Sequence, residues 1–321
     1  MPIGPMFRVS LLLAPALFAL ALSGQQSSAS GHPPGREVKQ EPGNTVYWIP
    51  PGPRRLSEDV FGTAENPKMT FKPKLQAAKE AVAAKKMPPA VPETLKKVPF
   101  LVGVPVKARS EDGNGDLWFK APTPFPDKGL IVEGSFSARF WDQVKEDPPG
   151  PPGKTPDKAE LEAEWTDPDG NTYRVVLDHI VKPPFPGYKS QGGVILDGYH
   201  HGSTGTGTPL MPQVWTIAGL WGIAELHVNG ELLEPNRVVH LMTTEIVRDK
   251  DYHLAVEEQM PLPPEQWHIK GQPHHTHLVV MPLVGVPGKG PVFKPAPTEF
   301  ELPNGQRQPF MHIMFEEDEV L

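Results

Sequence analysis

The sequence predicts a mainly β protein: an antiparallel β-sandwich of the jelly-roll or Greek-key type, with an extended proline-rich N-terminal arm and one short helix. Residues 98–321 contain many short runs in which apolar and polar residues alternate with the two-residue period of a strand. Turn-forming residues separate these runs. A helical period is almost absent from the same region, which favours packed antiparallel sheets.

The first 30 residues have the composition of a signal peptide. Arg8 supplies a positive charge, residues 9–22 are apolar, and small residues follow. The apolar run is shorter than the roughly 20 residues that a spanning helix needs. We therefore expect an exported protein, periplasmic or extracellular, that is soluble once the leader is removed.

Residues 31–97 form the predicted arm, because the prolines that are abundant there resist helices and central strands. One helix is expected within the arm, at residues 74–86. Its alanines favour helix, and Pro88 and Pro89 end it. The sandwich domain is then expected to span residues 98–321.

Seven strands are predicted from the alternating runs. In order, they are residues 130–142, 160–165, 173–181, 223–229, 237–247, 275–284 and 310–315. Turn residues between Asp167 and Asn171 make a hairpin of the second and third strands. The pair Asn229 and Gly230 begins a turn after the fourth strand, and we expect a longer loop before the fifth.

The chain contains no cysteine. This excludes disulfides, a lipid-modified cysteine, c-type haem attachment, iron–sulfur ligation and a blue-copper centre, all of which require a thiol. The formal net charge of −7 excludes a basic nucleic-acid footprint. We therefore expect no nucleic-acid partner. The histidines described next predict a metal ion as partner and cofactor, copper or alternatively zinc.

Two histidines, His275 and His277, lie at the start of an apolar run. On a strand, this spacing places both rings on one face, roughly 7 Å apart from the rise per residue. Imidazole is the commonest ligand of transition metals, so the pair predicts two ligands of one ion. The alternative is that both rings are held by hydrogen bonds at the strand entrance, without a metal.

A second histidine pair, His200 and His201, lies in a segment rich in glycine and hydroxyl residues. This composition predicts a loop with positive-φ positions, and its length suggests a functional role. A flexible surface loop with incidental histidines is the alternative.

Histidine and methionine share strand faces at two further places. His240 and Met242 lie on one face of their predicted strand, and His312 and Met314 on one face of another. Such soft pairs suit copper, although core packing is the usual role of a buried methionine.

The order of these candidate ligands resembles that of the ascorbate-dependent copper monooxygenases of the peptidylglycine-hydroxylating type. The resemblance covers six residues. It implies that His200, His201 and His240 hold an electron-transfer copper, and that His275, His277 and Met314 hold an oxygen-activating copper.

From the sequence we therefore predict an exported metal-binding protein with a histidine-rich site, of which a copper oxidoreductase is one form. A catalytic site needs an open coordination position, whereas a carrier or buffer would have a closed one. The alternative is a metal-free structural or ligand-binding β-sandwich module.

Overall fold

The computed structural model describes most of the chain after the predicted leader. The described residues are 35–50, 52–56, 58–68, 70–98, 109–111, 117–123, 125–144, 154–182, 192–206, 211–254, 261–296 and 310–321. The predicted signal peptide, residues 1–30, lies outside them. No helix in these ranges is long and apolar enough to cross a membrane.

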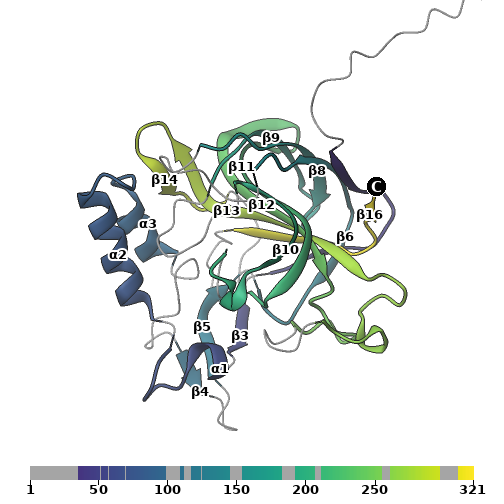
Figure 1. The fold of residues 1–321 in the computed structure, drawn as a ribbon. Coiled ribbons are helices and arrows are strands. Elements are labelled where there is room, and N and C mark those ends of the chain that lie inside the picture. The colour runs from purple at the N-terminus through teal and green to yellow at the C-terminus, as the bar shows by residue number, and fades with distance from the viewer. Residues whose placement is uncertain are drawn as a thin grey trace, which may run out of the picture. The chain divides into compact units, whose positions relative to one another are not determined.

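The fold is mainly β, and one antiparallel sheet of 13 strands dominates it (Figure 1). Along the sheet the strands run β16-β1-β7-β8-β9-β11-β12-β13-β15-β2-β6, with β10 paired to β11 and β14 paired to β13. Their bounds are β1 Arg36–Gln40, β2 Val46–Trp48, β6 Leu130–Val132, β7 Gly134–Trp141, β8 Lys158–Thr166, β9 Thr172–Ile180, β10 Val194–His200, β11 Val214–Val228, β12 Glu231–Glu245, β13 His274–Val286, β14 Gly290–Phe293, β15 Met311–Phe315 and β16 Glu319–Val320.

The sheet curls into a half-barrel, so the predicted sandwich of two separate sheets is not confirmed. The physical reason is the length of β11 and β12, which have 15 residues each. One half of β11 pairs with β10 and the other half with β9. A single long strand thus continues through the curl, where a sandwich would have strands of two separate sheets. Register shifts in the β11–β12 ladder mark irregularities of the kind that let strands bend.

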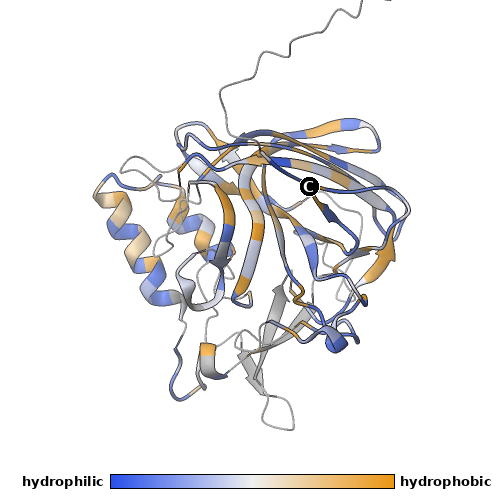
Figure 2. Ribbon diagram, turned by 45° about the vertical axis from the view of Figure 1, so that its right-hand side comes forward, coloured by the Kyte–Doolittle hydropathy of each residue, from blue (hydrophilic) through white to orange (hydrophobic). Residues whose placement is uncertain are grey.

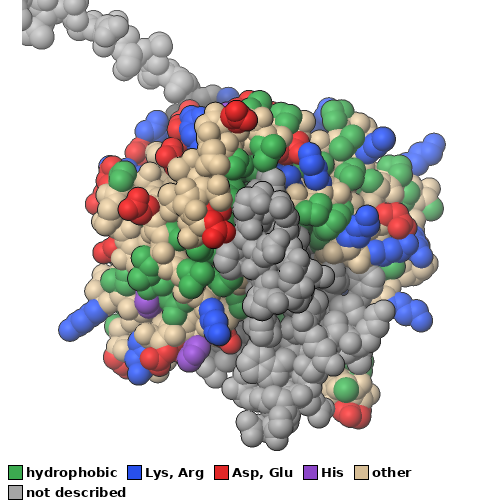
Figure 3. All heavy atoms as spheres, turned by 180° about the vertical axis from the view of Figure 1, so that it is seen from behind, with side chains coloured by type: hydrophobic (Ala, Val, Ile, Leu, Met, Phe, Trp, Pro, Cys, Tyr) green, Lys and Arg blue, Asp and Glu red, His purple; other side chains and the backbone are tan. Residues whose placement is uncertain are grey.

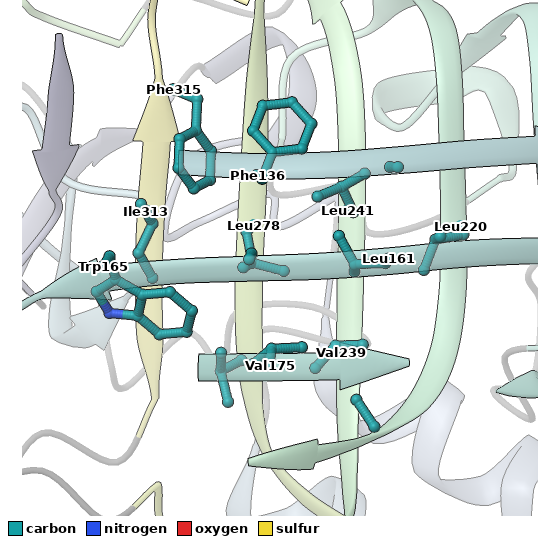
Figure 4. Packing of buried hydrophobic residues seen from close by; sticks show 14 of the residues in the cluster. Phe136, Leu161, Trp165, Val175, Leu220, Val239, Leu241, Leu278, Ile313 and Phe315 are labelled. Atoms are coloured by element: carbon teal, nitrogen blue, oxygen red, sulfur yellow. The ribbon is translucent and has the colours of Figure 1, made fainter. Parts of the chain in front are cut away.

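The main core lies inside the curl. Figure 4 shows β7, β8 and β9 running across β12, β13 and β15, with apolar side chains between the two layers. The rings of Phe136 and Phe315 come together there, with centroids 4.6 Å apart. Trp165 stacks on Tyr173 at 5.7 Å. The alternation that predicted these strands thus selects the residues that face inward.

The outer face of the long strands is also apolar. Figure 2 marks hydrophobic positions along the strands of the sheet. Helices α1 Glu58–Phe61, α2 Phe71–Ala83 and α3 Val91–Lys97 contribute to the cluster on this face. Leu95 of α3 belongs to it together with Trp221 and Met281 of the sheet. The Thr94 hydroxyl fastens α3 to the sheet by donating to the Pro291 carbonyl at 2.9 Å.

The segment predicted as an extended arm supplies part of the main sheet. Strand β1 pairs with β7 and β16, and strand β2 pairs with β15 and β6. A separate three-stranded sheet joins β3 Gly52–Leu56, β5 Leu117–Thr123 and β4 Arg109–Glu111. The predicted helix exists as α2 but begins and ends three residues earlier than residues 74–86.

Both predicted hairpins are present. Asp167 closes the β8–β9 turn by accepting hydrogen bonds from the backbone N–H groups of Asp169 and Asn171, each at 2.9 Å. Asn229 and Gly230 have φ angles of 50° and 83° and join β11 directly to β12. The expected longer loop is therefore wrong, because two positive-φ residues suffice for a tight turn.

The surface seen in Figure 3 carries acidic and basic side chains among neutral and apolar ones.

Candidate metal centre

Most histidines of interest lie on the outer face of the sheet. On β12, Val239 and Leu241 face the main core, so the intervening His240 and the following Met242 face outward. The register places Met242 opposite His277 of β13, two positions along the strand from the pair formed by His240 and Val279.

His200 and His201 reach this face from the end of β10. Consecutive residues of a strand point to opposite faces, yet these two rings lie 4.3 Å apart between centroids. The cause is the backbone of His201, whose φ of 59° is uncommon for a residue with a side chain. Such a conformation costs on the order of 1–3 kcal/mol and persists where surrounding contacts enforce it.

The loop after His201 is held by hydrogen bonds. The His201 N–H donates to the Thr206 carbonyl at 2.8 Å, and the Thr204 hydroxyl donates to the His201 carbonyl at 2.6 Å. Gly202 has a φ of 55° and lies against Gln213, with no space for a side chain. These contacts hold the backbone conformation of His201.

The tautomer of His240 follows from its hydrogen bond. Its Nδ1 lies 2.8 Å from the Leu220 carbonyl, which can only accept, so Nδ1 carries the proton and Nε2 carries a lone pair. The Trp221 ring stacks on the imidazole at 4.1 Å and holds its plane. Metal-ligating histidines are commonly oriented in this way, with the second nitrogen donating to a carbonyl.

Three imidazoles therefore meet in a buried place. We call His200, His201 and His240 the three-histidine group; one ligand atom from each lies within 4.8 Å of the others. The Nε2 atoms of His201 and His240 are 3.5 Å apart. Two nitrogens bound tetrahedrally to one ion at about 2.0–2.1 Å would be separated by about 3.3 Å, so the spacing suits a shared ion.

Burial keeps His200 and His240 neutral. Burial lowers the pKa of His200 to about 3, with a further contribution from His240, and it lowers the pKa of His240 to about 4. Among the described residues, neither ring nitrogen of His200 has a hydrogen-bond partner. A buried polar atom without a partner costs about 1–3 kcal/mol, and a bound cation would remove that cost.

A thioether completes the arrangement. The Sδ atom of Met242 lies 2.7 Å from Nε2 of His201. The site thus places one soft sulfur donor beside the nitrogen donors. Met242 shared a predicted strand face with His240, and this alternation was the signal in the sequence that could have added it to the predicted ligands.

His275 and His277 share the outer face, with ring centroids 4.6 Å apart. Both nitrogens of His275 are engaged, however. The Val247 N–H donates to Nε2 at 3.1 Å, which places the proton on Nδ1, and Nδ1 donates to Glu316 at 3.0 Å. Glu316 is buried, and the adjacent His275 helps to keep the pKa of its carboxyl low despite that burial.

His277 contacts a histidine from the next strand. Its Nδ1 lies 3.3 Å from Nε2 of His312. Burial, followed by the neighbouring His275, lowers the pKa of His277 well below its ordinary value. Met314 pairs with His277 in the ladder, but it belongs to a separate apolar cluster with Ile49 and Tyr252. The structure thus brings three of the six predicted ligands into one group.

The remaining candidates lie elsewhere. His227 contacts Glu225 at 3.1 Å on β11. Asp249, Asp251 and His253 form a second group of ligand-type side chains, but on a turn where two of the three are exposed. Exposed acidic groups of this kind are common without a metal.

Comparison of the chain with protein-family models, with curated proteins and with solved structures gives no match.

Proposed function

We propose that the protein is an exported copper-binding protein whose ion is held by the three-histidine group. The observation that carries this proposal is the convergence of three buried imidazoles, one of which has no hydrogen-bond partner on either nitrogen among the described residues. Export rests on the leader predicted from the sequence.

Copper is favoured over zinc by the composition of the group. The thioether of Met242 lies beside Nε2 of His201, and no carboxylate of the described residues belongs to the group. Thioether sulfur is a soft ligand that selects Cu(I), whereas zinc sites use thiolate, imidazole and carboxylate.

A carrier or electron-transfer role fits this donor set better than catalysis. Three imidazoles and one thioether fill four positions, which leaves none for water or substrate in a tetrahedral site. Turnover at this ion would require the sulfur to move away. The metal-free alternative receives support from His275, since both of its nitrogens are satisfied by protein groups.

The choice of copper is tested by replacing Met242 with leucine. We expect Met242→Leu to weaken Cu(I) binding about 10- to 100-fold, or about 1.4–2.8 kcal/mol, while Zn²⁺ affinity changes less than about threefold. Affinities are measured without oxygen by competition with a chromogenic chelator. Met281→Leu makes the same change at another buried outer-face position and should leave both affinities unchanged.

Two outcomes would count against copper. Unchanged Cu(I) affinity in Met242→Leu would show that the sulfur is not a ligand. Tighter binding of Zn²⁺ than of Cu(I) by the unaltered protein would favour the zinc alternative.

A further inference from the structure

A second pair of buried nitrogens lies next to the three-histidine group. His277 and His312 are 4% and 1% exposed, and their rings stack at an angle of 18°. The facing atoms, Nδ1 of His277 and Nε2 of His312, are 3.3 Å apart. This equals the separation of about 3.3 Å expected for two nitrogens bound to one ion.

Hydrogen bonding fixes the protonation of His277. The Thr244 hydroxyl has one proton, which it donates to the Glu245 carbonyl at 2.7 Å. The same oxygen, 3.3 Å from Nε2 of His277, can then only accept. Nε2 of His277 therefore carries the ring proton, and Nδ1 directs a lone pair at His312.

Met242 lies between this pair and the three-histidine group. It is the cross-strand partner of His277, and directly opposed side chains on one face of an antiparallel pair are neighbours. Its sulfur is also 2.7 Å from Nε2 of His201. One thioether thus lies within reach of both groups.

The surrounding charges favour a monovalent ion. The buried carboxylate of Glu316 is bonded to His275, and the buried guanidinium of Arg248 lies over the Tyr252 ring at 5.1 Å. Both groups contact Tyr252, and their charges are opposite. A divalent ion would add two uncompensated charges to this dry region, and the cost of burying charge rises steeply with its size.

We propose that His277 and His312 form a second position for Cu(I), connected to the three-histidine group through the sulfur of Met242. The inference rests on the proposed copper chemistry, but it assigns a different pair of ligands. The fully loaded protein would then hold two Cu(I) ions side by side. With one ion bound, Met242 would pass it between the two positions by staying bound while the nitrogen ligands exchange.

The test is the number of Cu(I) ions that the full-length chain binds. Cu(I) is added without oxygen as its acetonitrile complex, in the presence of a chromogenic chelator that removes loosely held ions. The unaltered protein should retain two ions. His312→Phe preserves a stacking ring without a nitrogen, and it should retain one. His240→Ala should also retain one, held by the second pair.

The outcomes separate the two proposals. One ion in the unaltered protein, lost in His240→Ala and kept in His312→Phe, overturns the second position and leaves the three-histidine site intact. One ion in the unaltered protein, lost in His312→Phe and kept in His240→Ala, overturns the three-histidine site alone. No retained ion overturns both.

A hydrogen bond from His312 to His277 is the simple alternative to a second ion. It predicts one ion in the unaltered protein, lost in His240→Ala and kept in His312→Phe. Circular dichroism checks that each variant is folded, and His312→Gln replaces His312→Phe if the latter is not. The count for the unaltered protein does not depend on any variant.

Discussion

Replacing His240 with alanine is expected to lower the affinity of the three-histidine group for Cu(I) by about 100- to 1,000-fold, or about 2.8–4.1 kcal/mol. The variant removes one nitrogen donor whose lone pair is fixed by the bond from Nδ1 to the Leu220 carbonyl. The imidazoles of His200 and His201 would remain without a third nitrogen. Competition titration with Cu(I) measures the change.

His227→Ala is the matched control for this variant. His227 also lies on a long strand of the same sheet, but its ring contacts Glu225 and belongs to neither group of ligand-type side chains. Its replacement should leave the affinity within about twofold, which is under 0.5 kcal/mol. Equal losses in His240→Ala and His227→Ala would show that binding does not occur at the proposed group.

Acid is expected to destabilise the metal-free protein strongly. His200 and His240 have folded-state pKa values of about 3 and about 4, both lowered by burial from 6.5. Below pH 6.5 the unfolded chain binds protons at these two positions that the folded protein does not. The free energy of unfolding therefore falls as the pH drops from 6.5 toward 4, by about 1.4 kcal/mol per pH unit for each histidine.

Urea unfolding at pH 7 and pH 5 measures this effect. For the two histidines together we expect a loss on the order of 4 kcal/mol between pH 7 and pH 5. His240→Phe keeps a ring against Trp221 but cannot be protonated, so it should show about half of that loss. Identical unfolding free energies at pH 7 and pH 5 would contradict the buried, neutral state of these rings.

Alternation along the strands predicted which residues share a face. It placed His240 with Met242, and His275 with His277, because side-chain direction in a strand follows directly from position. It did not show what each ring nitrogen contacts. The partners of His275 come from Val247 and Glu316, which are distant in sequence, and such long-range contacts have no local signal.

The convergence of His200 and His201 depends on a local backbone feature. A strand pattern would send the two rings to opposite faces, and only the positive φ of His201 turns the second ring back. Glycine is the usual signal of such angles in a sequence, and a residue with a side chain adopts them uncommonly, although asparagine, aspartate and histidine do so more often than others. In the sequence, the adjacent Gly202 was the residue that indicated a positive φ near this position.

The overall fold was predicted only in outline. Mainly antiparallel β structure was confirmed, since it follows from period and turn residues. Whether strands form two sheets or one curled sheet depends on how far β11 and β12 extend. Their lengths were underestimated because buried stretches of both strands, facing apolar clusters on either side, do not alternate.

The most direct test of the three-histidine group is anomalous X-ray diffraction at the copper absorption edge, from crystals of the copper-loaded protein. We predict a peak about 2.0 Å from a nitrogen of each of His200, His201 and His240, with the sulfur of Met242 next nearest. Copper found only at the exposed group of Asp249, Asp251 and His253, with the three imidazoles unligated, would contradict the proposed site.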